Sequence, residues 1–432
     1  MVNYFRPLYY LHGFLRRAYW SSDKLEDFQN RRLRSVIRNA YDNVPFFHNK
    51  FRELGIRADD IKNKSDLNKL PIIRKNEIRN NLDQMVSENY KIEDLKMLST
   101  SGSTGAPFFL YISEAENDFR KAKHLRANMS CGQKLLDKWV TITAPHHFGE
   151  SAGLQRKLGF FSPTPVSVFN DISSQISLIE DIGPDVLDGY SSSLLILANE
   201  LEKRGIETIK PRLVFGGAEL VDDHSRRVIE NVFGAPFYDQ YAIIEVERMS
   251  WQCPVGHDYH IDADALILQF VDENGEEVSP GERGEIVCTS LFNYAMPFIR
   301  YAVGDIGVSS DEICSCGRKL PLMRTVEGRK DSLIVLPNGR VLTPRSFTIA
   351  MNMFKYYRHI DQFRVIQQKQ DYLEFLIVLK DVSVDEDVIE KELFAHLRST
   401  FNLDQIRFEV KFVDGIPLDK SGKFMAVVSK IN

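Results

Sequence analysis

Residues 98–107, LSTSGSTGAP, gather Ser and Thr hydroxyls around two glycines, Gly102 and Gly105. Glycine permits positive φ and a close backbone approach, and hydroxyls add hydrogen-bond donors, so such a loop can wrap an anionic phosphate. No lysine follows Gly105, so this is not the nucleotide loop that ends in Gly-Lys-Ser/Thr. Taken alone, the run could equally be a Ser- and Gly-rich surface turn.

Short apolar runs alternate with helical stretches on the C-terminal side of this loop. We expect strands at residues 139–143, 166–169, 213–215 and 237–241, an alternation that indicates an α/β core with largely parallel strands. Two more strands, at 265–271 and 284–289, are joined by a polar turn and predict a β-rich subdomain after the core. On the N-terminal side, residues 22–96 carry apolar residues at helical spacing and predict a helical region.

The pattern of predicted strands and helices changes again after residue 328. An apolar strand near 375–379, a helix over 387–400 and a strand at 407–413 indicate a small α+β unit with its own core. We therefore predict an α/β protein in which a large N-terminal domain, residues 1–328, includes the β-rich subdomain. A hinge at 329–331 and a small mobile C-terminal domain, 332–432, follow.

Length and charge limit the classes of function. A chain of 432 residues predicts two or three packed units. A net charge of −5 and a pI near 6.1 give no case for nucleic-acid binding, so a small-molecule substrate fits better. Without a long apolar run or a signal-peptide pattern, we expect a cytoplasmic enzyme with no stable membrane insertion. The aromatic and Arg-rich residues 5–20 fit a helix docked on the main domain or a weak membrane-surface contact.

Four potential metal ligands occur in two clusters along the chain. Cys253 and His260 are seven residues apart, and Cys314 and Cys316 follow about fifty residues later. Three thiolates and one imidazole satisfy the tetrahedral preference of structural zinc, and a site closed by four protein ligands leaves no catalytic position. His257 is an alternative to His260, and buried free thiols are the other interpretation.

The hydroxyl-rich loop also resembles a known signature. Its residues match, in type and order, the Ser-Gly-(Ser/Thr)-Thr-Gly-x-Pro phosphate-binding motif of adenylate-forming ligases: Ser101, Gly102, Ser103, Thr104, Gly105 and Pro107. Segments 215–220, 241–245, 291–305, 328–331 and 416–423 resemble further motifs of that superfamily in the same order. The chain is therefore similar to the adenylate-forming superfamily over residues 98–423. It lies close to the phenylacetate-CoA ligase branch, which includes relatives in capsular polysaccharide biosynthesis.

This resemblance implies that ATP and a small-molecule carboxylic acid form an acyl-adenylate and pyrophosphate, with Mg²⁺ bridging the phosphates. Coenzyme A is the implied acceptor, and an amine or hydroxyl acceptor is the alternative. In the family, Glu245 would help to hold Mg²⁺, Thr104 would belong to the phosphate loop, and Lys423 would stabilise charge between carboxylate and α-phosphate. The other implied nucleotide contacts are Gly217, Ala218 and Glu219 at the adenine pocket, Tyr241 stacked on adenine, Asp305 on the ribose hydroxyls, and Arg329 on nucleotide oxygens.

Three further roles follow from the resemblance. Asp331 would be the hinge about which the C-terminal domain swings. His146, His147 and Tyr190 stand where family members form the walls of the acyl pocket, although ordinary packing explains them as well. A homodimer is a possible assembly.

The chain departs from the family pattern at three positions. Ala106 stands where many relatives have a lysine, and Ala242 and Ile244 replace the usual Gly and Thr. These departures motivate an alternative of another class, a nucleotide-binding scaffold with weak or no catalysis.

Overall fold

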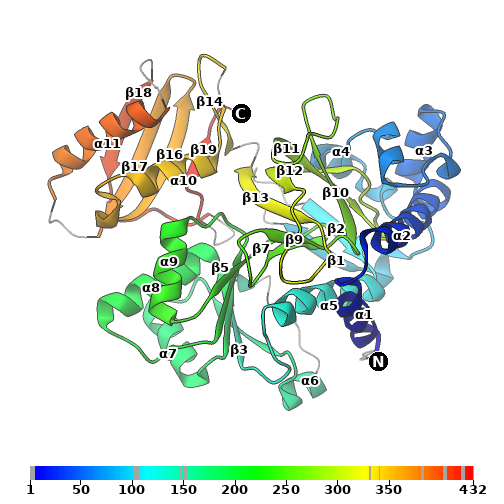
Figure 1. Ribbon diagram of the computed structural model, residues 1–432, viewed down its shortest axis with the longest axis horizontal. Helices are drawn as coiled ribbons and strands as arrows, with labels where there is room; N and C mark the ends of the chain where they lie inside the picture. The colour runs from blue at the N-terminus through cyan, green and yellow to red at the C-terminus, as the bar shows by residue number, and fades with distance from the viewer. Residues whose placement is uncertain are drawn as a thin grey trace.

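The computed structural model describes residues 5–100, 108–145, 148, 153–329, 332–339, 341–380, 384–401, 406–419 and 424–431. Figure 1 shows three regions: N-terminal helices in blue, a large central sheet in cyan to yellow, and a C-terminal unit in orange and red.

One eleven-stranded sheet, in the described part of the chain, forms the centre of the molecule in the order β10-β11-β12-β13-β9-β8-β7-β6-β5-β3-β4. Its parallel half consists of β3 (Trp139–Thr143), β4 (Pro163–Ser167), β5 (Val186–Tyr190), β6 (Leu213–Gly217) and β7 (Phe237–Ile243). Its antiparallel part consists of β8 (Glu247–Gln252), β9 (Tyr259–Ile261), β10 (Leu266–Val271), β11 (Arg283–Ser290), β12 (Tyr301–Ser310) and β13 (Leu322–Arg329).

Apolar side chains cover both faces of the parallel half. On one face, α7 (Ile172–Ile182), α8 (Ser191–Arg204) and α9 (Asp223–Phe233) bury Ile179, Leu197 and Phe233 against the strands. The opposite face joins the larger core that includes α5 (Glu114–Ser130). Buried on both sides, these strands hold the loops at their carboxyl ends in fixed positions. The short helix α6 (Gly153–Leu158) lies between β3 and β4 in the chain.

The N-terminal region is helical, as the sequence predicts. It contains α1 (Phe5–Arg17), α2 (Ser22–Asn43), α3 (Pro45–Glu53), α4 (Lys75–Asn80) and the short 3₁₀ helices η1 (Ala58–Asp60), η2 (Lys64–Lys69), η3 (Leu82–Gln84) and η4 (Ile92–Asp94). Helix α1 packs Phe14 against Phe119 of α5, so docking on the main domain accounts for its buried aromatic face. A hairpin of β1 (Lys96–Thr100) and β2 (Phe108–Ile112) follows.

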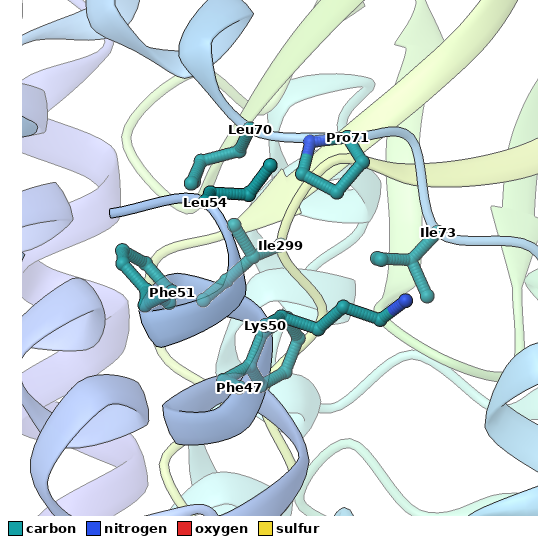
Figure 2. A pocket seen from close by; sticks show the side chains of 8 residues that line it. All are labelled: Phe47, Lys50, Phe51, Leu54, Leu70, Pro71, Ile73 and Ile299. Atoms are coloured by element: carbon teal, nitrogen blue, oxygen red, sulfur yellow. The ribbon is translucent and has the colours of Figure 1, made fainter. Parts of the chain in front are cut away.

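A small apolar hollow marks the place where this region meets the sheet. Figure 2 shows Phe47, Lys50 and Phe51 of α3 facing Pro71, Ile73 and Ile299 across it. Ile73 forms a bridge with Tyr301, the first residue of β12. None of the predicted site residues lines this hollow, and its apolar walls indicate a packing contact between α3 and the sheet.

The C-terminal unit has its own sheet, in the order β18-β17-β16-β19, and its own hydrophobic cluster. Its elements are β14 (Ile334–Val335), β15 (Val341–Leu342), α10 (Pro344–Met353), η7 (Tyr357–His359), β16 (Ile360–Lys369), β17 (Tyr372–Leu379), α11 (Glu386–Phe401), β18 (Arg407–Phe412) and β19 (Val427–Ser429). The predicted boundaries at 328, 329–331 and 332 remain predictions.

The predicted mixed α/β class is confirmed, with three differences in detail. The β-rich strands continue the central sheet. Strand β4 begins at Pro163, three residues before the predicted start, because the pattern of apolar residues does not show its proline-containing first half. Strand β5, VLDGY, was not predicted, since Asp and Gly are rare in strands. Among the described helices, none combines the length and apolar character that crossing a bilayer requires.

Candidate functional site

Gly217 and Tyr241, two of the predicted nucleotide contacts, lie near the carboxyl ends of the neighbouring strands β6 and β7. Gly217 lies opposite Gln240 on the neighbouring strand, and a Cβ on Gly217 would stand 2.7 Å from the Gln240 carbonyl oxygen. Only glycine fits so close to a backbone oxygen. The next residue, Ala218, has a φ of 67°, a left-handed conformation that costs about 1–2 kcal/mol for a residue with a Cβ. The chain therefore turns sharply here and presents Glu219 beside the sheet.

Glu219 accepts two backbone hydrogen bonds from distant parts of the chain. Ser192 N, in the first turn of α8, donates to Oε2 at 2.8 Å. Phe424 N donates to Oε1 at 2.5 Å. Phe424, which directly follows the predicted catalytic Lys423 in the sequence, therefore contacts the residue after Gly217 and Ala218.

Asp305 and Tyr241 meet across the sheet. The Tyr241 hydroxyl donates to Asp305 Oδ2 at 2.6 Å, and Asp305 is buried. On the adjacent strand, Arg329 is the register partner of Asp305, so the backbone of the predicted hinge motif begins beside the predicted ribose contact. These three motifs, far apart in sequence, therefore come together.

Glu245 has two partners, Tyr301 and Lys75, whose contacts with it were not predicted. The Tyr301 hydroxyl donates to Glu245 Oε1 at 2.7 Å, and Lys75 Nζ lies 3.5 Å from the same oxygen. Lys75 Nζ also stands 4.8 Å from the centre of the Phe108 ring. Phe108 is the first residue after the hydroxyl-rich loop, so the described end of that loop lies close to the carboxylate expected to hold Mg²⁺.

Helix α5 fixes the backbone around Glu245. Arg120 donates to the Ile244 carbonyl oxygen at 2.7 Å and to that of Glu245 at 3.2 Å, and Lys123 donates to that of Val246 at 2.6 Å. Cationic donors to buried carbonyls form strong hydrogen bonds in a medium of low dielectric constant. The segment that carries Tyr241 and Glu245 is therefore held from the interior of the protein.

A buried charge cluster lies beneath this segment. Glu247 Oε1 lies 3.2 Å from His124 Nδ1, and Glu247 Oε2 lies 4.0 Å from Lys123 Nζ. Burial raises the pKa of Glu247, but the His124 hydrogen bond and the charges of Arg248 and Lys123 outweigh burial and hold that pKa well below its ordinary value. Glu247 is therefore a carboxylate that balances buried cations.

Several predicted residues lie outside the described residues, and their roles remain predictions. They are Ser101, Gly102, Ser103, Thr104, Gly105, His146, His147, Asp331, Lys423 and the side chain of Arg329. Of the acyl-pocket candidates, Tyr190 is described. It ends β5, precedes α8 and is buried, and burial raises its pKa.

The four predicted zinc ligands form one cluster. The ligand atoms of Cys253, His260, Cys314 and Cys316 all lie within 4.8 Å of one another. Cys314 Sγ is 3.4 Å from Cys253 Sγ, which is too long for a disulfide, and Cys316 Sγ is 3.3 Å from His260 Nε2. Among the described residues it is His260, and not the alternative His257, that belongs to the cluster. The donor set fits zinc.

Comparison with known proteins agrees with this geometry. Residues 339–430 match the family model of the CapK C-terminal domain. The chain is 29% identical over 325 residues to a phenylacetate-coenzyme A ligase of Pseudomonas putida, which covers 73% of each chain. It is 25% identical over 410 residues to that of Escherichia coli strain K12, which covers 92% of this chain and 91% of the relative. The crystal structure of 2-hydroxyisobutyryl-CoA ligase in the postadenylation state with R3-HIB-AMP shares its fold, with a TM-score of 0.83 at 17% identity over 96% of this chain and 92% of that one.

Proposed function

We propose that the chain is an adenylate-forming ligase of the phenylacetate-CoA ligase-like branch and that it activates a carboxylic acid with ATP, as its similarity to phenylacetate-coenzyme A ligases supports. The products of the first step are an acyl-adenylate and pyrophosphate. In the second step the acyl group passes to coenzyme A.

One observation carries this proposal. The described residues next to two loops that are more than 300 residues apart reach the same edge of the sheet: Phe108 approaches Glu245 through Lys75, and Phe424 bonds to Glu219. Tyr241 and the buried Asp305, which are hydrogen-bonded to each other, come from motifs that lie between these two loops in the chain. A site that joins a phosphate loop, a ribose contact and a terminal lysine is what adenylation requires, because the reaction aligns a carboxylate with the α-phosphate.

The chemistry proposed for the residues follows from the resemblance to adenylate-forming ligases. Asp305, which accepts a hydrogen bond from the Tyr241 hydroxyl, would also accept hydrogen bonds from the ribose hydroxyls. The hydroxyl-rich loop would hold the departing pyrophosphate. A carboxylate oxygen of the acid attacks the α-phosphorus, the bond to the bridging oxygen breaks, and Lys423 would balance the charge that develops. Glu245 would hold Mg²⁺, whose charge, when bound, neutralises the phosphates.

Two kinds of molecule are candidates for the acceptor of the acyl group in the second step. Coenzyme A is the acceptor named in the phenylacetate-coenzyme A ligases to which the chain is similar. The second candidate, which the resemblance to capsular polysaccharide relatives suggests, is transfer to an amine or hydroxyl in polysaccharide or natural-product biosynthesis; residues 339–430 match the CapK C-terminal domain.

Exchange of labelled pyrophosphate into ATP tests the first step. With a panel of carboxylic acids we expect exchange with at least one acid and its loss in Lys423→Ala. Running the same panel for pyrophosphate release with and without coenzyme A then distinguishes a thiol acceptor from another. ATP binding without exchange for any acid would contradict the proposal and favour a nucleotide-binding scaffold, the alternative suggested by Ala106, Ala242 and Ile244.

Zinc at Cys253, His260, Cys314 and Cys316 is part of this proposal as a structural ion, supported by the convergence of the four ligand atoms. A cytoplasmic location and a homodimer also remain proposals, which cell fractionation and sedimentation would test.

A further inference from the structure

The carboxylate of Glu219 joins the two units of the molecule. Ser192 N, one of its donors, belongs to α8 on the central sheet. The other donor, Phe424 N, lies in the C-terminal unit, three residues before β19. Because α8 has no side-chain cap at Tyr190, Glu219 also satisfies an N–H group at the start of that helix.

A second residue holds the same segment from the C-terminal unit alone. Arg364 of β16 donates from Nη2 to the Pro417 carbonyl oxygen at 2.9 Å and from Nε to the Met425 carbonyl oxygen at 2.8 Å. Its guanidinium also lies 5.3 Å from the centre of the Phe424 ring. Arg364 thus ties together residues on both sides of Lys423, and all its partners here belong to the C-terminal unit.

The two side chains differ in where their partners lie. Arg364 holds the ends of residues 417–425 whatever the orientation of the unit, because its bonds stay within that unit. Glu219 bonds to Phe424 only while the C-terminal unit rests on the central sheet. Any rotation that carries the unit away must break this bond.

From this we infer that Glu219 is a positioning residue for adenylation, which latches Phe424, the residue after the predicted catalytic Lys423, onto the central sheet. The inference rests on the proposed function. The strained left-handed backbone of Ala218 and the close approach at Gly217 direct the carboxylate to this contact. A rotation of the C-terminal unit about the predicted hinge before acyl transfer would break this bond.

Two measurements test the latch. The first is hydrogen–deuterium exchange of peptides that contain Phe424, in the full chain without ligands. We expect faster exchange in Glu219→Ala than in the wild type, and no change in Glu392→Ala. Glu392 is a matched control, because its exposed ion pair with Lys355 lies within the C-terminal unit.

The second measurement compares the half-reactions. In Glu219→Ala and in the isosteric Glu219→Gln, we expect the rate of pyrophosphate release to fall about ten- to a hundred-fold, the value of one charge-assisted hydrogen bond. Acyl transfer from preformed acyl-adenylate should fall far less. A residue that only caps α8 would slow both half-reactions together.

The results of these measurements distinguish a failure of the proposed role of Glu219 from a failure of the proposed ligase function. Unchanged exchange at Phe424 in both Glu219 variants overturns the latch, whether or not the protein is active. Equal loss of both half-reactions overturns it as well. A wild type without acid-dependent exchange of pyrophosphate overturns the proposed function, while faster deuterium exchange in the variants would still support the docking contact.

Discussion

At the scale of single residues, Lys75 offers a cation that the hydroxyl-rich loop lacks. Ala106 stands where many relatives carry a lysine, and Lys75 Nζ lies between the Phe108 ring and Glu245. We predict that Lys75→Met raises the KM for ATP about tenfold or more, since a charged hydrogen bond to phosphate would be lost. Initial rates of pyrophosphate release over a range of ATP concentrations measure this.

The control for this prediction is Lys64→Met, because Lys64 makes an exposed ion pair with Glu277 and has no described contact with the site. An unchanged KM for ATP in Lys75→Met would show that Lys75 only balances the charge of Glu245.

Glu247 is the residue whose charge most clearly affects stability. Its pKa is held below the ordinary 4.5, since the His124 hydrogen bond and the charges of Arg248 and Lys123 outweigh the effect of burial. Such a group stabilises the fold above the pKa of the unfolded state and loses that contribution as pH falls. We predict that Glu247→Gln lowers the free energy of unfolding by about 3–5 kcal/mol at pH 7, because buried cations lose their partner.

Denaturant titrations of wild type and Glu247→Gln at several pH values measure this loss. The difference in unfolding free energy between the two proteins should shrink as pH drops below about 4.5. A constant difference across that range would contradict a depressed pKa.

At the scale of elements, the cysteine cluster connects strands to the N-terminal helices. Lys319 N, three residues after Cys316, donates to the Ala18 carbonyl oxygen at 2.7 Å, and Arg318 Nη2 donates to Ser130 O at the end of α5. We predict about one zinc per chain, and more than about a hundredfold loss of zinc affinity in Cys314→Ser, since changes outside the ligand set already cost up to that much.

Elemental analysis and chelator competition measure the zinc content and affinity. We also expect faster proteolysis between α1 and α2 in Cys314→Ser, because the contact at Ala18 depends on the cysteine loop. Cys131→Ser is the control: Cys131 is buried outside the cluster and burial raises its pKa to about 12. A metal-free wild type of full stability would contradict the prediction.

The same scale shows where sequence reasoning succeeds. Spacing and donor type predicted the convergence of the three cysteines with a histidine, but they left His257 open as an alternative to His260, and tertiary packing decides between the two. The edge formed by Gly217, Tyr241 and Asp305 was predictable through a resemblance to known motifs. Lys75 was not, because a lysine at the start of a short helix looks solvated until tertiary packing brings it to Glu245. The two hydrogen bonds that Glu219 accepts, from Ser192 N and Phe424 N, were also not predictable, because one of them joins the two units and no local sequence pattern indicates such a contact.

At the scale of the whole molecule, the C-terminal unit has the features of an independent domain. Its cluster includes fully buried Phe347, Phe375 and Leu393, drawn from α10, β17 and α11. Its described contacts with the rest of the chain include the hydrogen bonds from Asn199 Nδ2 to Asp361 Oδ1 at 3.1 Å and from Thr343 Oγ1 to Glu327 Oε2 at 2.9 Å, and an edge-to-face contact between Tyr357 and His224. We therefore predict that residues 332–432 fold alone, and that residues 1–331 bind ATP without catalysing exchange of pyrophosphate.

Circular dichroism of the fragment 332–432 should show cooperative thermal unfolding. Fragment 332–432 of a Leu393→Ala variant should melt at a lower temperature, because a cavity in this core costs about 2–5 kcal/mol. A fragment without cooperative unfolding would show that the small core needs the central sheet, and would move the domain boundary away from residue 332.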